Sequence, residues 1–283
     1  MKRKYGLLKD YILSLRKVAV AFSGGVDSTF LLKVAADALG GDVLAITVVS
    51  PYIPKWEIEE AQAFTKELGI QHKLLRVPIN SELCNNPENR CYICKKIMFS
   101  MMSDLANSLG FPDVLDGTNQ DDLNDYRPGI AALSEMGILT PLLDLHFSKK
   151  EIREMSHELG LSTWDKSAYA CLLSRIPYGQ LITLDDLRRI EDAERYLMDR
   201  GFRWIRVRSH GDLARIEVER EERYRMFNDN LLDQIDLKLR ELGYKYVTFD
   251  LGGYRVGSLN DQIERKGGSY HSGSLKEGAG GTS

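Results

Sequence analysis

Residues 18–28 have the sequence Val-Ala-Val-Ala-Phe-Ser-Gly-Gly-Val-Asp-Ser, which changes from apolar to polar at its centre. The apolar half, residues 17–22, predicts a strand that is buried on both faces. Residues 23–25 break the run, and an apolar helical pattern begins at Asp27. A strand, a glycine turn and a helix start direct backbone N–H groups and the positive end of the helix dipole towards an anion. The stretch therefore predicts a phosphate site, in which Ser23 and Ser28 add hydroxyl donors.

An isolated Gly-Gly pair would be explained by a strand–helix turn that binds nothing. A Walker loop would need a longer glycine spacing and a following lysine, and the stretch has neither. The string Ser-Gly-Gly-Val-Asp-Ser at residues 23–28 is more specific. It resembles the pyrophosphate loop, or PP-loop, of the ATP pyrophosphatase superfamily. The resemblance implies that ATP is cleaved between its α and β phosphates, giving an acyl-adenylate and pyrophosphate, and that Asp27 is a carboxylate ligand for Mg²⁺.

Composition sets wide limits on function. The chain has 283 residues, enough for one large domain or two ordinary ones, and its net charge of −3 gives no general attraction to nucleic acid or anionic lipid. No apolar run approaches the ~20 residues that a membrane span needs. The amino terminus lacks a signal-peptide pattern. We therefore expect a cytoplasmic protein without a nucleic-acid or membrane partner.

Strand and helix patterns alternate over residues 1–180 and predict an α/β fold with a doubly wound, Rossmann-like parallel sheet. Ligands of such sheets bind beyond the carboxyl ends of the strands. We therefore expect the loop after the first strand and the segment after the fourth to meet at a nucleotide site. The predicted strands are residues 17–22, 43–49, 72–79, 113–117 and 138–142. The predicted nucleotide-binding residues are Ser23, Gly24, Gly25, Asp27, Ser28, Thr47, Gly117, Thr118 and Asn119.

The pattern changes after residue 180 and predicts a smaller α+β domain over residues 181–266. Thr183 is expected to cap a helix, and a hairpin is expected over residues 204–219. A long helical pattern covers residues 221–242, and a last strand is predicted at 244–251. Residues 267–283 are rich in glycine and serine and predict a disordered tail.

The chain has four cysteines, namely Cys84, Cys91, Cys94 and Cys171. In an intracellular protein such thiols are more often ligands or free groups than disulfides. Cys91 and Cys94 lie on one predicted helical turn, and Cys171 lies near the domain boundary. The thiols can be buried and inert, or all four can hold a structural zinc ion. Alternatively, Cys91, Cys94 and Cys171 hold an iron–sulfur cluster with one open iron. Composition alone leaves all three open.

Four motifs occur together in one order: the PP-loop, residues 90–95, residues 117–128 and residues 170–177. This set resembles the sulfur-inserting enzymes of nickel-pincer cofactor biosynthesis, which serve lactate racemase, over residues 4–260. The resemblance implies that ATP adenylates a carboxylate of pyridinium-3,5-biscarboxylic acid mononucleotide and that sulfur then replaces AMP, twice. It also implies a homo-oligomer, with a trimer-based hexamer as one form, and Asp122 as a second residue for Mg²⁺.

The same resemblance bears on the cysteines. Some members of the family donate the sulfur of a single cysteine, which leaves dehydroalanine and a spent protein. That cysteine corresponds to Cys171. Because Cys91 and Cys94 are also present, this chain resembles the three-cysteine branch, which implies a [4Fe-4S] cluster on these three residues and sulfide or another donor. Cys84 matches neither pattern and is expected to be an ordinary thiol.

Arg206 and Arg208 lie two apart on a predicted strand and therefore share a face. Paired guanidinium groups suit a phosphate monoester, although a solvated face would also explain them. The resemblance favours binding of the substrate phosphate. It extends the substrate site to Glu217, Glu194 and Arg255, and it gives Ser174 and Arg175, beside Cys171, catalytic roles near the reacting carboxylate.

Three other functions remain open. A tRNA thiolase of the same superfamily would need a basic RNA-binding surface, which this acidic chain lacks in its composition. An ammonia-fed, amide-forming synthetase of the NAD synthetase type would have no use for the three cysteines. A nucleotide-binding module would bind ATP without releasing pyrophosphate.

Overall fold

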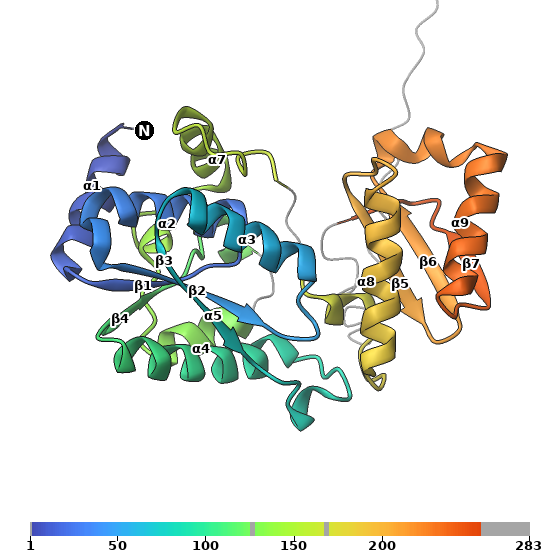
Figure 1. Cartoon of the computed structure of the whole chain (residues 1–283), viewed down its shortest axis with the longest axis horizontal. Coiled ribbons are helices and arrows are strands. Elements are labelled where there is room, and N and C mark those ends of the chain that lie inside the picture. Colours follow the sequence, from blue (N-terminus) through green and yellow to red (C-terminus); the bar gives the residue numbers. More distant parts are fainter. Residues whose placement is uncertain (1, 125–127, 167–169, 256–283) are drawn as a thin grey trace, which may run out of the picture.

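The computed structural model of the chain describes residues 2–124, 128–166 and 170–255, which form two lobes side by side (Figure 1). Each lobe contains its own sheet, of four strands in the first lobe and three in the second. The domain boundary near residue 180 remains our proposal. The expected disordered tail at residues 267–283 and residues 125–127 of the third motif lie outside the described residues.

The four-stranded sheet is parallel throughout, with the order β3-β2-β1-β4. Because β1 and β2 are central, nearly all of their side chains are buried, whereas β3 at the edge is largely exposed. This arrangement confirms the predicted parallel α/β sheet and the double burial of the first strand. The strands are β1 (Val18–Ala21), β2 (Val43–Val49), β3 (Gln71–Arg76) and β4 (Asp113–Leu115).

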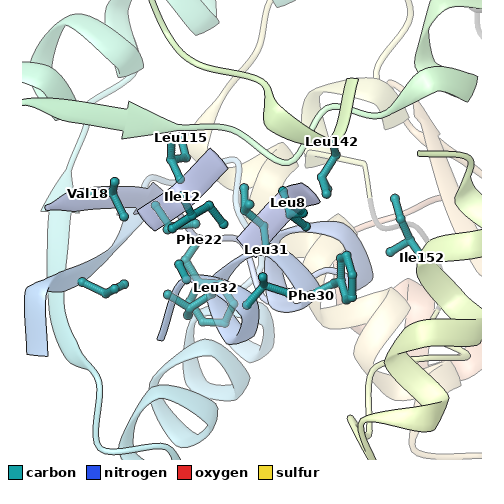
Figure 2. Packing of buried hydrophobic residues seen from close by; sticks show 14 of the residues in the cluster. Leu8, Ile12, Val18, Phe22, Phe30, Leu31, Leu32, Leu115, Leu142 and Ile152 are labelled. Carbon is teal, nitrogen blue, oxygen red and sulfur yellow. The ribbon is translucent and has the colours of Figure 1, made fainter. Parts of the chain in front are cut away.

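Helices cover both faces of this sheet (Figure 1). On one face lie α1 (Lys2–Leu15), α2 (Val26–Leu39), α3 (Lys55–Glu67) and α7 (Lys149–Glu158), and on the other lie α4 (Arg90–Ser108) and α5 (Pro128–Glu135). A capping box starts α7, in which the Ser148 side chain accepts the N–H of Glu151 and the Glu151 side chain accepts the N–H of Ser148. Side chains from α1, α2, α7 and the sheet form one continuous core (Figure 2), which includes Leu8, Ile12, Phe22, Phe30, Leu31, Leu115 and Ile152.

The fifth strand predicted at residues 138–142 is wrong. Leu139 makes only an isolated parallel bridge to Leu115, and Pro141 then begins the short helix α6 (Pro141–Asp144). Proline has no N–H to donate to a strand ladder, and its fixed φ suits the first position of a helix. The apolar run therefore packs against the sheet edge without extending it.

The second lobe begins with α8 (Leu184–Met198), where the Thr183 side chain accepts the N–H of Asp186 as predicted. The predicted hairpin is also confirmed: β5 (Ile205–His210) and β6 (Leu213–Val218) are antiparallel, and Arg206 lies opposite Glu217. β7 (Tyr246–Phe249) adds to β6 in parallel. The lobe is therefore α+β.

The single long helix predicted at residues 221–242 is wrong. A 3₁₀ segment (Arg220–Met226) is followed by a break and then by α9 (Asp229–Glu241). The Asn228 side chain accepts the N–H of Leu231 at 3.0 Å, so Asn228 caps a new helix. Because the apolar periodicity continues across the break, the sequence pattern does not reveal the capping residue Asn228.

No helix among the described residues is both long enough and apolar enough to cross a membrane.

Candidate active site

The PP-loop closes around its two serines. After β1 the chain turns through Gly24, whose φ of +71° lies in the left-handed region. The hydroxyl oxygens of Ser23 and Ser28 lie 3.1 Å apart, and the Ser28 hydroxyl accepts the N–H of Ser23 at 3.3 Å. Gly25 is the N-cap of α2 and supplies no side-chain cap, so N–H groups of the first turn stay available. The loop presents backbone and hydroxyl donors around one turn.

Gly117 brings a second loop against the PP-loop. A β-carbon on Gly117 would lie 3.0 Å from the backbone nitrogen of Ser28, so any larger residue would force the two loops apart. The next residue is held by its neighbour, because the N–H of Thr118 donates to Asp116 Oδ1 at 2.9 Å. Asn119 follows with only 1% of its surface exposed. The segment after β4 thus meets the loop after β1, as the strand order requires.

Asp27 lies in the first turn of α2. The ammonium of Lys149, at the start of α7, donates to Asp27 Oδ2, while Asp27 Oδ1 is buried and has no hydrogen-bond partner among the described residues. Burial raises the pKa of Asp27, and the positive charge of Lys149 only partly offsets this rise. The nearby carboxylate of Asp122 raises the pKa further. Carboxylate oxygens are the ligands that Mg²⁺ prefers, and one of these oxygens is orphaned. Asp27 and Asp122 therefore fit a Mg²⁺ ion.

A cavity of about 310 Å³ is lined both by the PP-loop and by Cys171, which lies near the boundary between the two lobes. It lies at the carboxyl ends of β1 and β2, next to the starts of α2 and α3. Gly24 instead lines a larger cavity, of about 670 Å³, between α3 and the second lobe. The first cavity is lined by most of the predicted nucleotide residues together with Cys171: Ser23, Gly25, Asp27, Ser28, Thr47, Gly117, Thr118, Asp122 and Cys171.

Cys94 and Cys171 lie near Tyr52, and Cys91 precedes Cys94 by three residues on α4. Cys94 Sγ lies 3.4 Å from the Tyr52 hydroxyl oxygen, and the Tyr52 carbonyl accepts the N–H of Leu172 at 2.9 Å. Burial raises the pKa of the Cys94 thiol to about 12, the hydrogen bond with Tyr52 opposes the rise, and the charges of Cys171 and Cys91 add to it. Cys91 and Cys171 are thus both within electrostatic range of Cys94.

Across the residues that the structure describes, no three cysteine, histidine or acidic side chains converge as ligands of a single ion. Thiolates are the donors that iron–sulfur clusters take, so the three thiols fit such a cluster by their chemistry. Cys84 lies apart from them in its contacts, because its thiol donates to the carbonyl of Asn80 at 3.7 Å.

Arg175 fixes the segment after Cys171 to the second lobe. Its guanidinium has no exposed surface and donates to both carboxylate oxygens of Glu194 at 2.9 Å, and a third nitrogen donates to the Ala170 and Cys171 carbonyls. Glu194 also accepts the N–H of Val207 in β5 at 2.9 Å. Burial alone would raise the pKa of Glu194, but the charge and hydrogen bonds of Arg175 outweigh it and hold that pKa below its usual value.

A second arginine makes a parallel connection. Arg208 Nη1 donates to the Ser174 carbonyl at 2.7 Å, while its other nitrogens pair with both oxygens of Glu217 at 3.0 and 2.9 Å. Arg206, on the same strand, is also buried and its guanidinium lies 5.0 Å from the centre of the Tyr254 ring. The face predicted to bind phosphate is thus a buried junction. Arg255 is exposed at the end of the described chain.

Sequence reasoning missed four residues that contact the site. Lys149 reaches Asp27 across 122 positions, and Lys166 donates to the Gly24 carbonyl at 2.9 Å across 142 positions. Tyr52, in the loop between β2 and α3, is bonded to Leu172 beside Cys171, and Glu57, in the first turn of α3, lines the same cavity as Cys171. Only Lys149 had a signal, because the capping box places it at the start of a helix.

The parallel sheet, with this loop at the carboxyl end of β1, defines a PP-loop ATP pyrophosphatase fold. Residues 3–89 match the NAD synthase family. The chain is 40% identical over 263 residues to the pyridinium-3,5-bisthiocarboxylic acid mononucleotide synthase of Lactiplantibacillus plantarum, covering 91% of this chain and 92% of that protein.

Two further relatives match this chain over most of their own length. An uncharacterized Synechocystis protein is 44% identical over 262 residues, covering 92% of this chain and 98% of that protein. An uncharacterized Methanocaldococcus jannaschii protein is 32% identical over 240 residues, covering 85% of this chain and 91% of that protein. The chain belongs to the PP-loop family that includes the Lactiplantibacillus synthase.

Proposed function

We propose that this protein is an ATP-dependent sulfurtransferase. It adenylates a carboxylate of pyridinium-3,5-biscarboxylic acid mononucleotide and replaces the AMP with sulfur, and two rounds give the bisthiocarboxylic acid mononucleotide. The observation that carries the proposal is that residues of the PP-loop and Cys171 line one cavity. Its chemical identity is supported by 40% identity, over 91% of the chain, to a synthase named for that product.

In the first step, a carboxylate oxygen of the substrate attacks the α-phosphorus of ATP. A new P–O bond forms, the bond to the β-phosphate oxygen breaks, and pyrophosphate leaves. The N–H groups and serine hydroxyls of the PP-loop hold the phosphates, and Lys149 adds positive charge beside Asp27. Asp27 and Asp122 would hold Mg²⁺, which supplies charge to the leaving pyrophosphate when bound.

In the second step, a sulfur nucleophile attacks the acyl carbon, the C–O bond to AMP breaks, and AMP leaves with the electron pair. Cys91, Cys94 and Cys171 would hold a [4Fe-4S] cluster, which offers an open iron for exogenous sulfide when bound. The segment around Cys171 contributes by position: Ser174 donates to the Cys171 carbonyl at 2.9 Å, and Arg175 holds the same carbonyl. This arrangement keeps the sulfur beside the cavity in which the adenylate forms.

The second lobe completes the substrate site in this proposal. Because Arg206 and Arg208 are buried at the junction and Arg208 holds the Ser174 carbonyl, the mononucleotide phosphate reaches them when that contact opens. Glu217 orients Arg208, and Arg255 contributes from the end of the described chain. Glu194 acts through Arg175. We further propose a cytoplasmic homo-oligomer, with a trimer-based hexamer as its assembly.

The test is pyrophosphate exchange into ATP, measured anaerobically with Mg²⁺, with and without the mononucleotide. Exchange that depends on the mononucleotide is expected, and mass spectrometry should then detect a thiocarboxylate once sulfide is added. Exchange that needs no mononucleotide, or ATP binding without exchange, would contradict the proposal.

The match of residues 3–89 to the NAD synthase family supports a second candidate, an amide-forming synthetase. The two candidates share the adenylate and differ in the nucleophile. Replacing sulfide with ammonia in the same assay separates them, because only the synthetase would convert the adenylate to an amide at a rate above the uncatalysed one.

A further inference from the structure

Glu57 is an acidic residue of the cavity that neither the PP-loop nor the cysteine motifs explain. It lies in the first turn of α3 and lines the same cavity as Asp27 and Cys171. Its Oε1 atom is buried and accepts no hydrogen bond from any residue that the structure describes. A buried carboxylate oxygen without a donor is costly, so its presence at a reactive site calls for a chemical reason.

The charges around Glu57 come from several elements. Burial raises the pKa of Glu57 to about 7, the positive charges of Lys166, Arg175 and Arg206 oppose the rise, and the negative charge of Glu60 adds to it. Lys166 and Arg175 lie in the segments before and after Cys171. Arg206 lies on β5, and Glu60 lies on α3 with Glu57. A carboxyl group that titrates near neutral pH can both accept and release a proton under working conditions.

Arg175 links Glu57 to the sulfur site. The guanidinium donates to the Cys171 carbonyl at 3.2 Å. Burial lowers the pKa of Arg175, but the charge of Glu194, followed by those of Cys171 and Glu57, outweighs burial and raises it. Glu57 and Cys171 thus lie within electrostatic range of the same guanidinium and on the wall of the same cavity.

We propose that Glu57 is the general base of the sulfur-transfer step. Its carboxylate accepts the proton of an incoming hydrosulfide as the sulfur bonds to the acyl carbon. The C–O bond to AMP breaks, AMP leaves with the electron pair, and the proton on Glu57 then passes to water. This role rests on the proposed function, and it identifies Glu57 as the base of the sulfur-transfer step.

The test compares Glu57→Gln with the wild type and with Glu59→Gln, which removes the same charge from an exposed position of α3. Each protein receives ATP, Mg²⁺, the mononucleotide and sodium hydrosulfide. In Glu57→Gln, thiocarboxylate formation should fall about 100-fold or more, while mononucleotide-dependent pyrophosphate exchange stays within about twofold. Glu59→Gln should change neither rate.

A second readout does not depend on turnover. Infrared difference spectra should show one carboxyl group titrating near pH 7 in the wild type and in Glu59→Gln, and its absence in Glu57→Gln. At a constant concentration of the hydrosulfide anion, the rate of sulfur transfer in the wild type should rise as the pH increases through about 7 and then level off, because the base must be ionised, whereas Glu57→Gln should lack this rise.

Undiminished sulfur transfer in Glu57→Gln would overturn the proposal, and so would an equal loss of exchange and transfer, which would indicate binding or folding. A wild-type protein without mononucleotide-dependent exchange would instead refute the proposed function itself. The two failures are therefore distinguishable.

Discussion

The PP-loop and the cysteine segment, residues 170–177, line one cavity but are held in opposite ways. The hydrogen bonds of the PP-loop serines join residues no more than five positions apart. The cysteine segment is held from a distance: Asn86 Nδ2 lies 2.7 Å from the Ile176 carbonyl, and Glu194 pairs with Arg175. The turn of the PP-loop is thus held by bonds within its own sequence, whereas the cysteine segment is held only when both lobes are folded together.

The comparison predicts that the cysteines can be removed without loss of the nucleotide site. Cys91→Ala, Cys94→Ala and Cys171→Ala should each abolish iron and acid-labile sulfide binding in anaerobically prepared protein, while ATP affinity persists. Cys84→Ala serves as the control and should change neither quantity. Loss of function in Cys171→Ala alone would favour the self-sacrificing mechanism, and one zinc per chain without iron would make the cysteines structural.

The buried pair between the lobes should carry a large share of stability. Arg175→Ala leaves the buried Glu194 without its guanidinium partner, and should lower the free energy of unfolding by about 3–5 kcal/mol in urea titrations. Arg195→Ala, on the same helix as Glu194, breaks a pair in which both side chains are more than half exposed and should cost less than about 1 kcal/mol. Equal costs would contradict the account of the lobe junction.

Stability should also depend on pH through Glu57. The pKa of this group is raised in the folded protein, so its contribution is fully present below its ordinary pKa of 4.5 and is lost as the pH rises through about 7. Between pH 5 and 7.5 the free energy of unfolding should fall by about 2 kcal/mol more in the wild type than in Glu57→Gln. Parallel pH curves for the two proteins would show that Glu57 is ionised at all these pH values.

Adding a single methyl group at Gly117 should weaken ATP binding. Gly117→Ala places a β-carbon 3.0 Å from the Ser28 nitrogen, and we expect ATP affinity to fall about tenfold in isothermal titration, about 1.4 kcal/mol. Gly6→Ala is the matched control, because a β-carbon there has no neighbour within 4 Å and the helix α1 should tolerate it. Unchanged affinity in Gly117→Ala would mean that the two loops separate easily.

The same contrast explains which features could be predicted from the sequence. Residues 18–28 specify strand, turn and helix through contacts with near neighbours, and the Ser148 capping box and the hairpin around residues 210–212 are local in the same way. The helix break at Asn228 was missed because one capping residue interrupts a continuous apolar pattern. The strand expected near Leu139 was missed because a proline two residues later ends the pairing.

The candidate site divides in the same manner. The nucleotide residues come from two strand ends that the parallel topology brings together. The partners of Arg208 and Arg175 could not be read from the chain, because guanidinium groups on a strand or loop suit a phosphate and a buried carboxylate equally well. Glu57 carries no motif, and only its burial beside the cavity distinguishes it from Glu59 and Glu60 on the same helix.

The most direct test of sulfur transfer in this cavity is the number of thiocarboxylate groups formed per chain. Anaerobic protein would be supplied with ATP, Mg²⁺, the mononucleotide and excess sulfide, and products counted by mass spectrometry. We expect several thiocarboxylates per chain, each matched by one pyrophosphate. A mononucleotide that acquires no sulfur while ATP is cleaved would contradict this expectation.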